Sequence, residues 1–156
     1  MNDTLRAPAV EQAIYIDAPP EHVYATLTTA AGWNAWFTHE AAIDLAPGGK
    51  LKFHWKDWGP DGITTDAEGM VRAFEPGRRF VMDWESGAEA WTTVTFDLET
   101  RGSGTVVRLR EAGFALTERD LRVLVATALG WGEALALLKF YLEHGLTYGV
   151  VPPPTG

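Results

Sequence analysis

The last third of the sequence carries a helical pattern of apolar residues. Between Thr117 and Gly145 they recur at steps of three and four, the spacing of one stripe on an α-helix. The stripe consists of Leu121, Leu124, Val125, Ala128, Trp131, Leu135, Leu138 and Leu142. Thr117 followed by Asp120 predicts a capping-box start, and Gly145 predicts a left-handed end. We therefore expect one long helix that crosses a whole small domain.

The chain before this helix mostly alternates apolar and polar residues, which is typical of strands. The clearest case is 51–56, where Leu51, Phe53 and Trp55 alternate with two lysines and a histidine. Gly69 indicates a bulge or a close backbone approach in a later strand. The element order is one strand, two short helices, six strands and the long helix. This order predicts an α+β fold, a curved antiparallel sheet wrapped around the C-terminal helix.

Length, charge and cysteine content narrow the classes of function. The chain has 156 residues, which predicts one domain over 9–146 with tails at 1–8 and 147–156. A net charge of −8 argues against nucleic acid and anionic membrane surfaces as partners. The chain has no Cys, which excludes disulfides and fits a reducing cytoplasm. The uncharged run 22–39 is too polar to span a bilayer, so we expect no membrane insertion.

Seven tryptophans are unusual for a chain of 156 residues. Because Trp is rarely fully buried, we expect several of them to line a cavity between the sheet and the long helix. Core packing is the alternative for any single residue. The candidate ligand-binding residues are Trp33, Trp36, Phe37, Phe53, Trp55, Met82, Trp84, Trp91, Trp131 and Leu135. An aromatic wall of this kind favours flat or apolar ligands.

The sequence carries no recognisable catalytic or metal-binding motif. The four histidines form no i, i+4 pair beside a carboxylate, so we predict no metal site and no cofactor. The titratable or basic groups on the later strands are Asp66, Glu68, Asp83, Glu85, Glu89, Arg108, Arg110 and Glu111. In so acidic a chain we interpret these groups as surface residues. Catalytic residues stay unassigned, because catalysis would require an acid or base that faces the cavity.

Short motifs in a specific order resemble one superfamily. They are Ala18-Pro19-Pro20-Glu21-His22-Val23, Trp33 with Trp36-Phe37, Pro47-Gly48-Gly49, Gly69-Met70-Val71, Glu75-Pro76, Asp83-Trp84, Gly130-Trp131 and Tyr141-Leu142-Glu143-His144-Gly145. Together they resemble the START-like, birch-pollen-allergen-like (SRPBCC) superfamily, and within it the homologues of the activator of heat-shock protein 90 ATPase. The resemblance implies a helix-grip fold with a hydrophobic cavity. Relatives include lipid and hormone binders, polyketide cyclases, stress-response proteins and co-chaperones, so the fold alone gives no activity.

Three functions remain open at this stage. The first is binding of a small, largely apolar or aromatic molecule without catalysis, and the second is a cyclase or dehydratase that uses the same cavity. A buried carboxylate, His or Arg in an open cavity would favour the second. The third is a co-chaperone-like interaction module. Contact with heat-shock protein 90 is disfavoured, because the chain is too short for the second domain of the eukaryotic activators. A homodimer is a further hypothesis, with Trp58 in a loop as a candidate contact.

Overall fold

The computed structural model describes residues 5–147, which form one seven-stranded antiparallel sheet and three helices. The elements are β1 (Val10–Ile16), α1 (Pro20–Thr28), α2 (Ala30–Trp36), β2 (Glu40–Ile43), β3 (Lys50–Trp58), β4 (Ile63–Glu75), β5 (Arg79–Trp84), β6 (Thr92–Arg101), β7 (Gly104–Ala112) and α3 (Glu118–His144). The predicted element order and the helix-grip fold are confirmed. The predicted tails fall mostly on residues outside the described range, and the domain boundaries stay a prediction.

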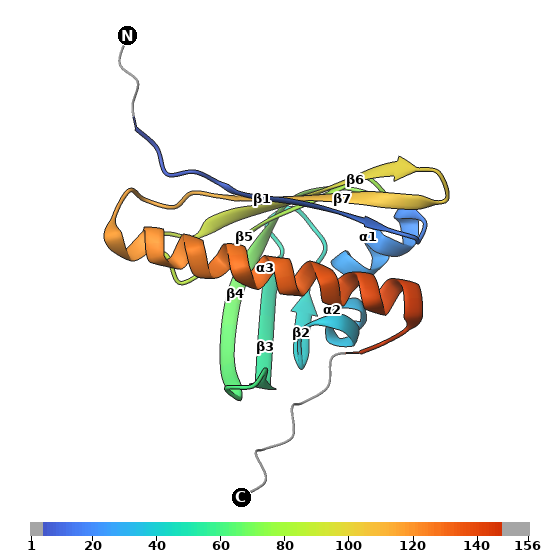
Figure 1. The fold of residues 1–156 in the computed structure, drawn as a ribbon, viewed down its shortest axis with the longest axis horizontal. Coiled ribbons are helices and arrows are strands. Elements are labelled where there is room, and N and C mark those ends of the chain that lie inside the picture. Colours follow the sequence, from blue (N-terminus) through green and yellow to red (C-terminus); the bar gives the residue numbers. More distant parts are fainter. Residues whose placement is uncertain (1–4, 148–156) are drawn as a thin grey trace, which may run out of the picture.

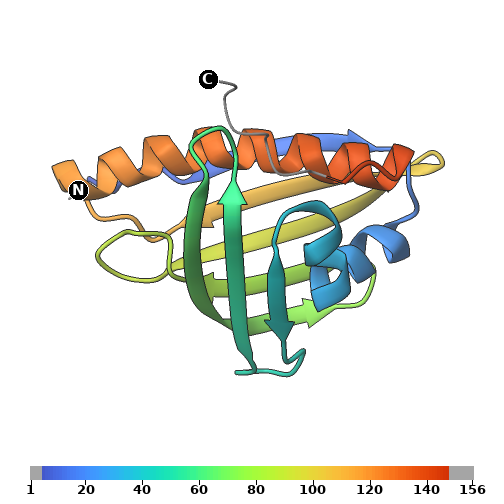
Figure 2. The same ribbon diagram turned by 90° about the horizontal axis from the view of Figure 1, so that it is seen from below.

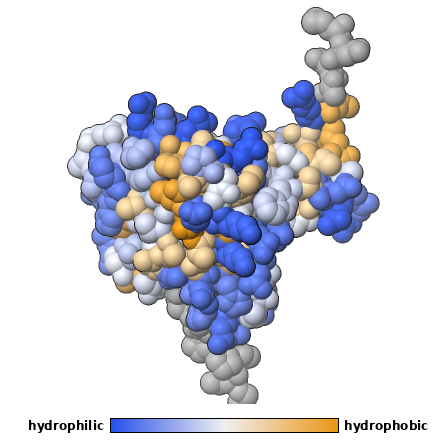
Figure 3. Space-filling view, turned by 180° about the vertical axis from the view of Figure 1, so that it is seen from behind, coloured by the Kyte–Doolittle hydropathy of each residue, from blue (hydrophilic) through white to orange (hydrophobic). Residues whose placement is uncertain are grey.

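The sheet is strongly curved and α3 lies along its concave side. The strand order is β1-β7-β6-β5-β4-β3-β2. β1, β7 and β6 run beside α3, whereas β2, β3 and β4 cross beneath it, and α1 and α2 close one end (Figures 1 and 2). On the opposite side of the molecule, hydrophilic residues cover much of the surface, with apolar patches near its centre and at its upper right edge (Figure 3). The core therefore lies between the sheet and α3.

Close packing of β4 against β5 depends on Gly69. A Cβ atom at this position would lie 2.6 Å from the carbonyl oxygen of Asp83, so no larger residue fits without a shift. The predicted close approach is thus confirmed. The bulge lies elsewhere: the register slips between Val71 and Ala73, which leaves Arg72 as the extra residue. Bulges increase local twist and help a sheet to curve.

The ends of α3 are as predicted, but its apolar stripe is not entirely buried. The Thr117 hydroxyl accepts a hydrogen bond from the Asp120 N–H at 3.1 Å, and Gly145 takes a left-handed φ of 68°. Leu121 and Val125, predicted on the stripe, are 38% and 59% exposed. At about 100° per residue, they lie about 80° and about 120° around the helix from the buried Trp131. The sheet therefore covers a narrower face of α3 than the apolar stripe in the sequence predicts.

Length and composition would also allow α3 to cross a membrane. Core helices of soluble domains pass the same test, and this helix is built into the domain. Trp131, Ala134, Leu135 and Leu138 are buried. These residues make α3 a part of the hydrophobic core of the domain.

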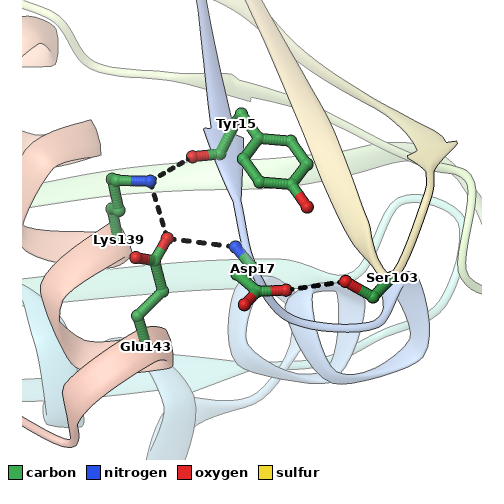
Figure 4. Close-up of polar contacts among 5 residues, drawn as sticks. All are labelled: Tyr15, Asp17, Ser103, Lys139 and Glu143. Atoms are coloured by element: carbon green, nitrogen blue, oxygen red, sulfur yellow. Dashed lines mark hydrogen bonds and ion pairs between the residues drawn. The ribbon is translucent and has the colours of Figure 1, made fainter.

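A polar network anchors the last turns of α3 to β1 (Figure 4). The Lys139 Nζ atom donates to the Tyr15 carbonyl and to Glu143 Oε2, both at 2.6 Å. The same Glu143 oxygen accepts the Asp17 N–H at 3.0 Å, and the Ser103 hydroxyl donates to Asp17 at 3.0 Å. The bonds that Glu143 accepts from Lys139 and, second, from the Asp17 N–H lower the pKa of Glu143. The network therefore ties the C-terminal end of α3 to the end of β1.

A tryptophan-lined cleft as the candidate functional site

An open cleft of about 640 Å³ lies between α3, the β5–β6 loop and the strands β3 and β4. This volume is in the range of pockets that hold small molecules. One side of the cleft is lined by residues 84–89 and 91. The other side is lined by Arg119, Thr127, Gly130 and Trp131 of α3. The cleft therefore lies beside the first half of α3, where the sheet no longer covers the helix completely.

The ten predicted ligand-binding residues divide into two groups. Phe37, Trp55, Trp84, Trp91 and Trp131 line the cleft. Trp33, Trp36, Phe53, Met82 and Leu135 do not line it and are at most 2% exposed. The Trp33 indole N–H donates to the Leu27 carbonyl at 2.8 Å, and its ring lies 4.6 Å from that of Phe53. The second group packs in the core, the alternative that we kept open for each residue.

Four of the aromatic residues of the cleft, Phe37, Trp55, Trp84 and Trp131, form one continuous wall. The ring centroids of Trp84 and Trp131 lie 5.6 Å apart, with the planes tilted by 32°. Trp55 meets Trp84 edge-on at 6.4 Å, and Phe37 meets Trp55 edge-on at 5.3 Å. Such offset and edge contacts are the favourable arrangements of aromatic pairs. They leave a pre-formed apolar surface.

A buried carboxylate lies behind this wall. Glu111 is 0% exposed, although we expected a surface residue, and that interpretation was wrong. Its Oε1 atom accepts the Trp84 indole N–H at 2.8 Å and the Thr92 hydroxyl at 2.6 Å. Its Oε2 atom accepts the Trp131 indole N–H at 2.6 Å. One side chain of β7 thus holds residues from β5, β6 and α3.

Strand alternation could have identified Glu111. Val107 and Leu109 of β7 face the core, and Glu111 is the next residue with the same parity. Thr92 shares the inward side of β6 with Val94 and Phe96 in the same way. An acidic residue on an inward position needs hydrogen-bond donors, because burying an unpaired charge is costly. The two tryptophans and the threonine supply these donors.

A second buried carboxylate holds the β5–β6 loop in place. Asp120, in the first turn of α3, accepts the Ala115 N–H at 2.8 Å and the Glu89 N–H at 3.0 Å. These two bonds, Ala115 first, lower the pKa of Asp120. The predicted capping box is therefore half formed: Thr117 caps the helix, whereas the acidic side chain bonds to other segments. The Asp120 side chain thus ties the loop that precedes Trp91 to α3, and Arg119 adds a bond to the Gly87 carbonyl at 3.4 Å.

The other polar residues of the lining are Thr65, Asp66, Glu85, Ser86, Glu89, Arg119 and Thr127. The Trp55 indole N–H is buried and has no hydrogen-bond partner among the described residues. His54 and Asp66 pair at 2.6 Å. Within residues 5–147, no group of three or more His, Asp or Glu side chains is arranged to hold a metal ion. Trp58, predicted as an exposed loop residue, instead ends β3, is half-buried and meets the Phe37 ring edge-on at 5.8 Å.

The curved sheet, the long C-terminal helix and the cleft between them define a START-like helix-grip protein. The chain belongs to the family described as activator of Hsp90 ATPase homolog 1-like proteins, which it matches over residues 17–143. This confirms the resemblance seen in the sequence. A search against curated proteins gives no significant match.

Solved structures of similar proteins agree with this assignment. The Aha1 dimer from Colwellia psychrerythraea is 24% identical, with a TM-score of 0.74 over 89% of this chain and 98% of that one. CalU16 from Micromonospora echinospora is 26% identical, with a TM-score of 0.67 over 88% of this chain and 77% of that one. A Mesorhizobium loti protein is 21% identical, with a TM-score of 0.70 over 85% and 94%. The fold is thus that of the family, which has a ligand-binding architecture.

Proposed function

We propose that this protein binds a small, flat, largely apolar or aromatic molecule in the tryptophan-lined cleft. The observation that carries the proposal is the aromatic lining of the cleft, made by Phe37, Trp55, Trp84, Trp91 and Trp131 along an open volume of about 640 Å³. Trp91 is 47% exposed, so a ligand that covers it would remove apolar surface from water. The wall is built before any ligand arrives, which lowers the entropic cost of binding.

A cyclase or dehydratase activity is the second candidate, and Glu111 is the observation that favours it. An open cleft with a buried carboxylate is the pattern that we expected of a catalyst. Both oxygens of this carboxylate, however, already accept indole N–H groups. A ligand in the cleft would meet the rings of Trp84 and Trp131 rather than the carboxylate behind them. General acid–base catalysis requires direct reach or one bridging water, so binding without catalysis is the better-supported function.

Ligand screening by NMR tests the binding proposal. Indole N–H signals of the folded protein would be followed during titration with fatty acids, flavonoids and polycyclic aromatic compounds. We expect saturable shifts of the Trp84, Trp91 and Trp131 signals with at least one compound. Trp91→Ala should weaken that binding, whereas Phe140→Ala, which removes a 51% exposed ring outside the cleft, should not. The proposal fails if the folded protein responds saturably to no compound of the panel.

We also propose that the protein forms a homodimer through the outer side of α3. Leu121, Val125 and Leu129 follow one another at intervals of four residues and are 38%, 59% and 74% exposed. Leu116, 50% exposed, continues this apolar strip before the helix. The Colwellia psychrerythraea protein with this fold is described as a dimer. A second copy of the strip would cover the apolar surface symmetrically, as in most homodimers.

Sedimentation velocity tests the homodimer. The wild-type protein should sediment as a dimer at micromolar concentration, and Val125→Glu should shift it to the monomer without loss of helical circular dichroism. Phe140→Glu places the same charge on another exposed position of α3 and should leave the dimer intact. A monomeric wild-type protein over the whole accessible concentration range would refute the dimer, and so would a Val125→Glu variant that stays dimeric.

A further inference from the structure

We propose that the cleft selects organic cations, namely molecules with a flat aromatic body that carries a positively charged nitrogen. This inference rests on the proposed binding function and specifies its ligand class. It follows from three features: the carboxylate behind the wall, the aromatic faces that form the wall, and the charged side chains along the cleft.

The first feature is the chemistry of Glu111. The partners of its carboxyl group are two indole N–H groups and one hydroxyl, all of them neutral. An indole N–H can only donate, so both oxygens act as acceptors. The carboxyl group has no cationic partner in this cluster and is 0% exposed. In a medium of low dielectric constant, a carboxylate at this position attracts a cation in the cleft with little screening.

The second feature is the set of ring faces. The faces of aromatic rings carry negative charge density and attract cations, most strongly for Trp. Trp84 and Trp131 each donate their N–H to the Glu111 anion, which shifts electron density toward the ring and strengthens this attraction. Trp55 and Phe37 continue the same wall, at centroid distances of 5.3–6.4 Å from their neighbours. A cation within about 6 Å of several ring centroids would be stabilised by each of them.

The third feature is the charge of the cleft lining. Among the described lining residues, Asp66, Glu85 and Glu89 are acidic and only Arg119 is basic. Asp66 pairs with His54, and Glu85 accepts the Glu68 N–H at 3.3 Å. The Arg119 guanidinium lies 3.4 Å from the Gly87 carbonyl. Among the described lining residues, carboxylates thus exceed guanidinium groups by two, three against one. An anionic ligand such as a fatty acid would be repelled.

Three probes with one ring system separate charge from shape. They are N-methylacridinium as the cation, acridine as the neutral molecule and acridine-9-carboxylate as the anion, each titrated by calorimetry at a pH where acridine is uncharged. We expect N-methylacridinium to bind about tenfold more tightly than acridine, and the carboxylate to bind most weakly. The part of this affinity difference that arises from the buried Glu111 should persist at high salt, because salt screens buried charges poorly.

Substitution assigns the preference to its source. Glu111→Gln should reduce the ratio of cation to neutral affinity several-fold while the protein still binds acridine. Glu133→Gln removes an exposed charge from α3 outside the cleft and should leave the ratio unchanged. If Glu111→Gln does not fold, the double variant Glu85→Gln, Glu89→Gln tests the carboxylates that line the cleft. It should also reduce the ratio of cation to neutral affinity.

The possible results separate the two proposals. Equal affinity of the wild-type protein for acridine and N-methylacridinium would overturn the cation preference and leave the binding function intact. Tighter binding of the carboxylate would overturn the preference as well. Absence of binding by all three probes would overturn the cation preference, and the binding function would fall with it if no compound of the NMR panel binds either.

Discussion

The indole rings of Trp84 and Trp131 lie 5.6 Å apart and donate their N–H groups to opposite oxygens of one carboxylate. Trp84 ends β5, whereas Trp131 lies in the middle of α3. The shared acceptor, Glu111, therefore sets the angle between a sheet residue and a helix residue. The stability of this wall should therefore depend on the two hydrogen bonds to Glu111.

Loss of the Glu111 carboxylate should destabilise the fold. Glu111→Gln replaces one acceptor oxygen by an amide N–H₂ group, which would face an indole or hydroxyl donor. We expect a loss of about 1–3 kcal/mol in the free energy of unfolding, measured by urea denaturation. Glu133→Gln is the control and should change this free energy by less than about 0.5 kcal/mol. An unchanged urea midpoint for Glu111→Gln would show that the carboxylate is dispensable.

Trp84 and Trp55, neighbours in the wall of the cleft, should respond differently to the same substitution. Trp84 and Trp55 are both 8% exposed, but only Trp84 has a hydrogen-bond partner for its indole N–H. Trp84→Phe and Trp55→Phe remove the same atoms, so packing losses are similar. We expect Trp84→Phe to cost about 1–2 kcal/mol more, because it also deprives a charged acceptor of its donor. Circular dichroism during denaturation measures this difference, and equal losses would contradict it.

The sequence predicts which residues face inward, but not which of them line the cleft. The strand pattern identifies Leu51, Phe53 and Trp55 as inward-facing, and the helix caps at Thr117 and Gly145 follow from residue type. Sequence spacing does not show which inward residues meet neighbours on all sides. Phe53 and Trp55 share a face of β3, yet only Trp55 reaches the cleft. That distinction depends on where α2 and α3 cross the curved sheet.

The function of acidic residues was the hardest part to predict. Glu111 has the inward parity of β7, but the abundance of surface carboxylates in this chain favoured the opposite interpretation. Asp120 fits a capping box, and only the fold brings the Glu89 and Ala115 N–H groups to its side chain. In both cases the partners come from distant segments, and local patterns carry no information on them.

Acid should weaken the attachment of the β5–β6 loop through Asp120. The pKa of Asp120 is lowered in the folded state by the N–H groups of Ala115 and Glu89. The folded state thus gains stability above the unfolded-state pKa of about 4, and this gain is lost as the pH falls through the lower folded-state value. Asp120→Asn should therefore be less stable than the wild type near neutral pH, and the gap should narrow on acidification.

Urea denaturation at a series of pH values measures this gap. Glu133→Gln serves as the reference, because its side chain is exposed and lies away from the β5–β6 loop. A gap between wild type and Asp120→Asn that stays constant from neutral pH down to pH about 3 would contradict the assigned role of the carboxylate.

A methyl group at position 130 should stabilise α3 and obstruct the cleft. Gly130 lines the cleft, and a Cβ atom there would meet no atom within 4 Å. Gly130→Ala should therefore raise the free energy of unfolding by up to about 1 kcal/mol, the difference in helix propensity. It should also weaken binding of any probe that occupies the cleft.

Gly132→Ala is the matched control for this effect. A Cβ atom at position 132 would be in ordinary contact with Gln12, at 3.6 Å, and Gly132 does not line the cleft. This variant should gain similar stability and keep the affinity of the wild type. Equal affinities of both variants for a bound probe would place that probe away from α3.

The β5–β6 loop contributes Glu85, Ser86, Gly87, Ala88, Glu89 and Trp91 to the cleft but no side chain to the fully buried core. Surface loops on a rigid scaffold tolerate changes in sequence and length. New loop sequences could thus redirect the protein toward other molecules while the sheet, α3 and the Glu111 cluster remain as they are. In evolutionary terms, ligand recognition can diversify at this loop while the fold stays the same, provided that each new loop still offers a backbone N–H to Asp120.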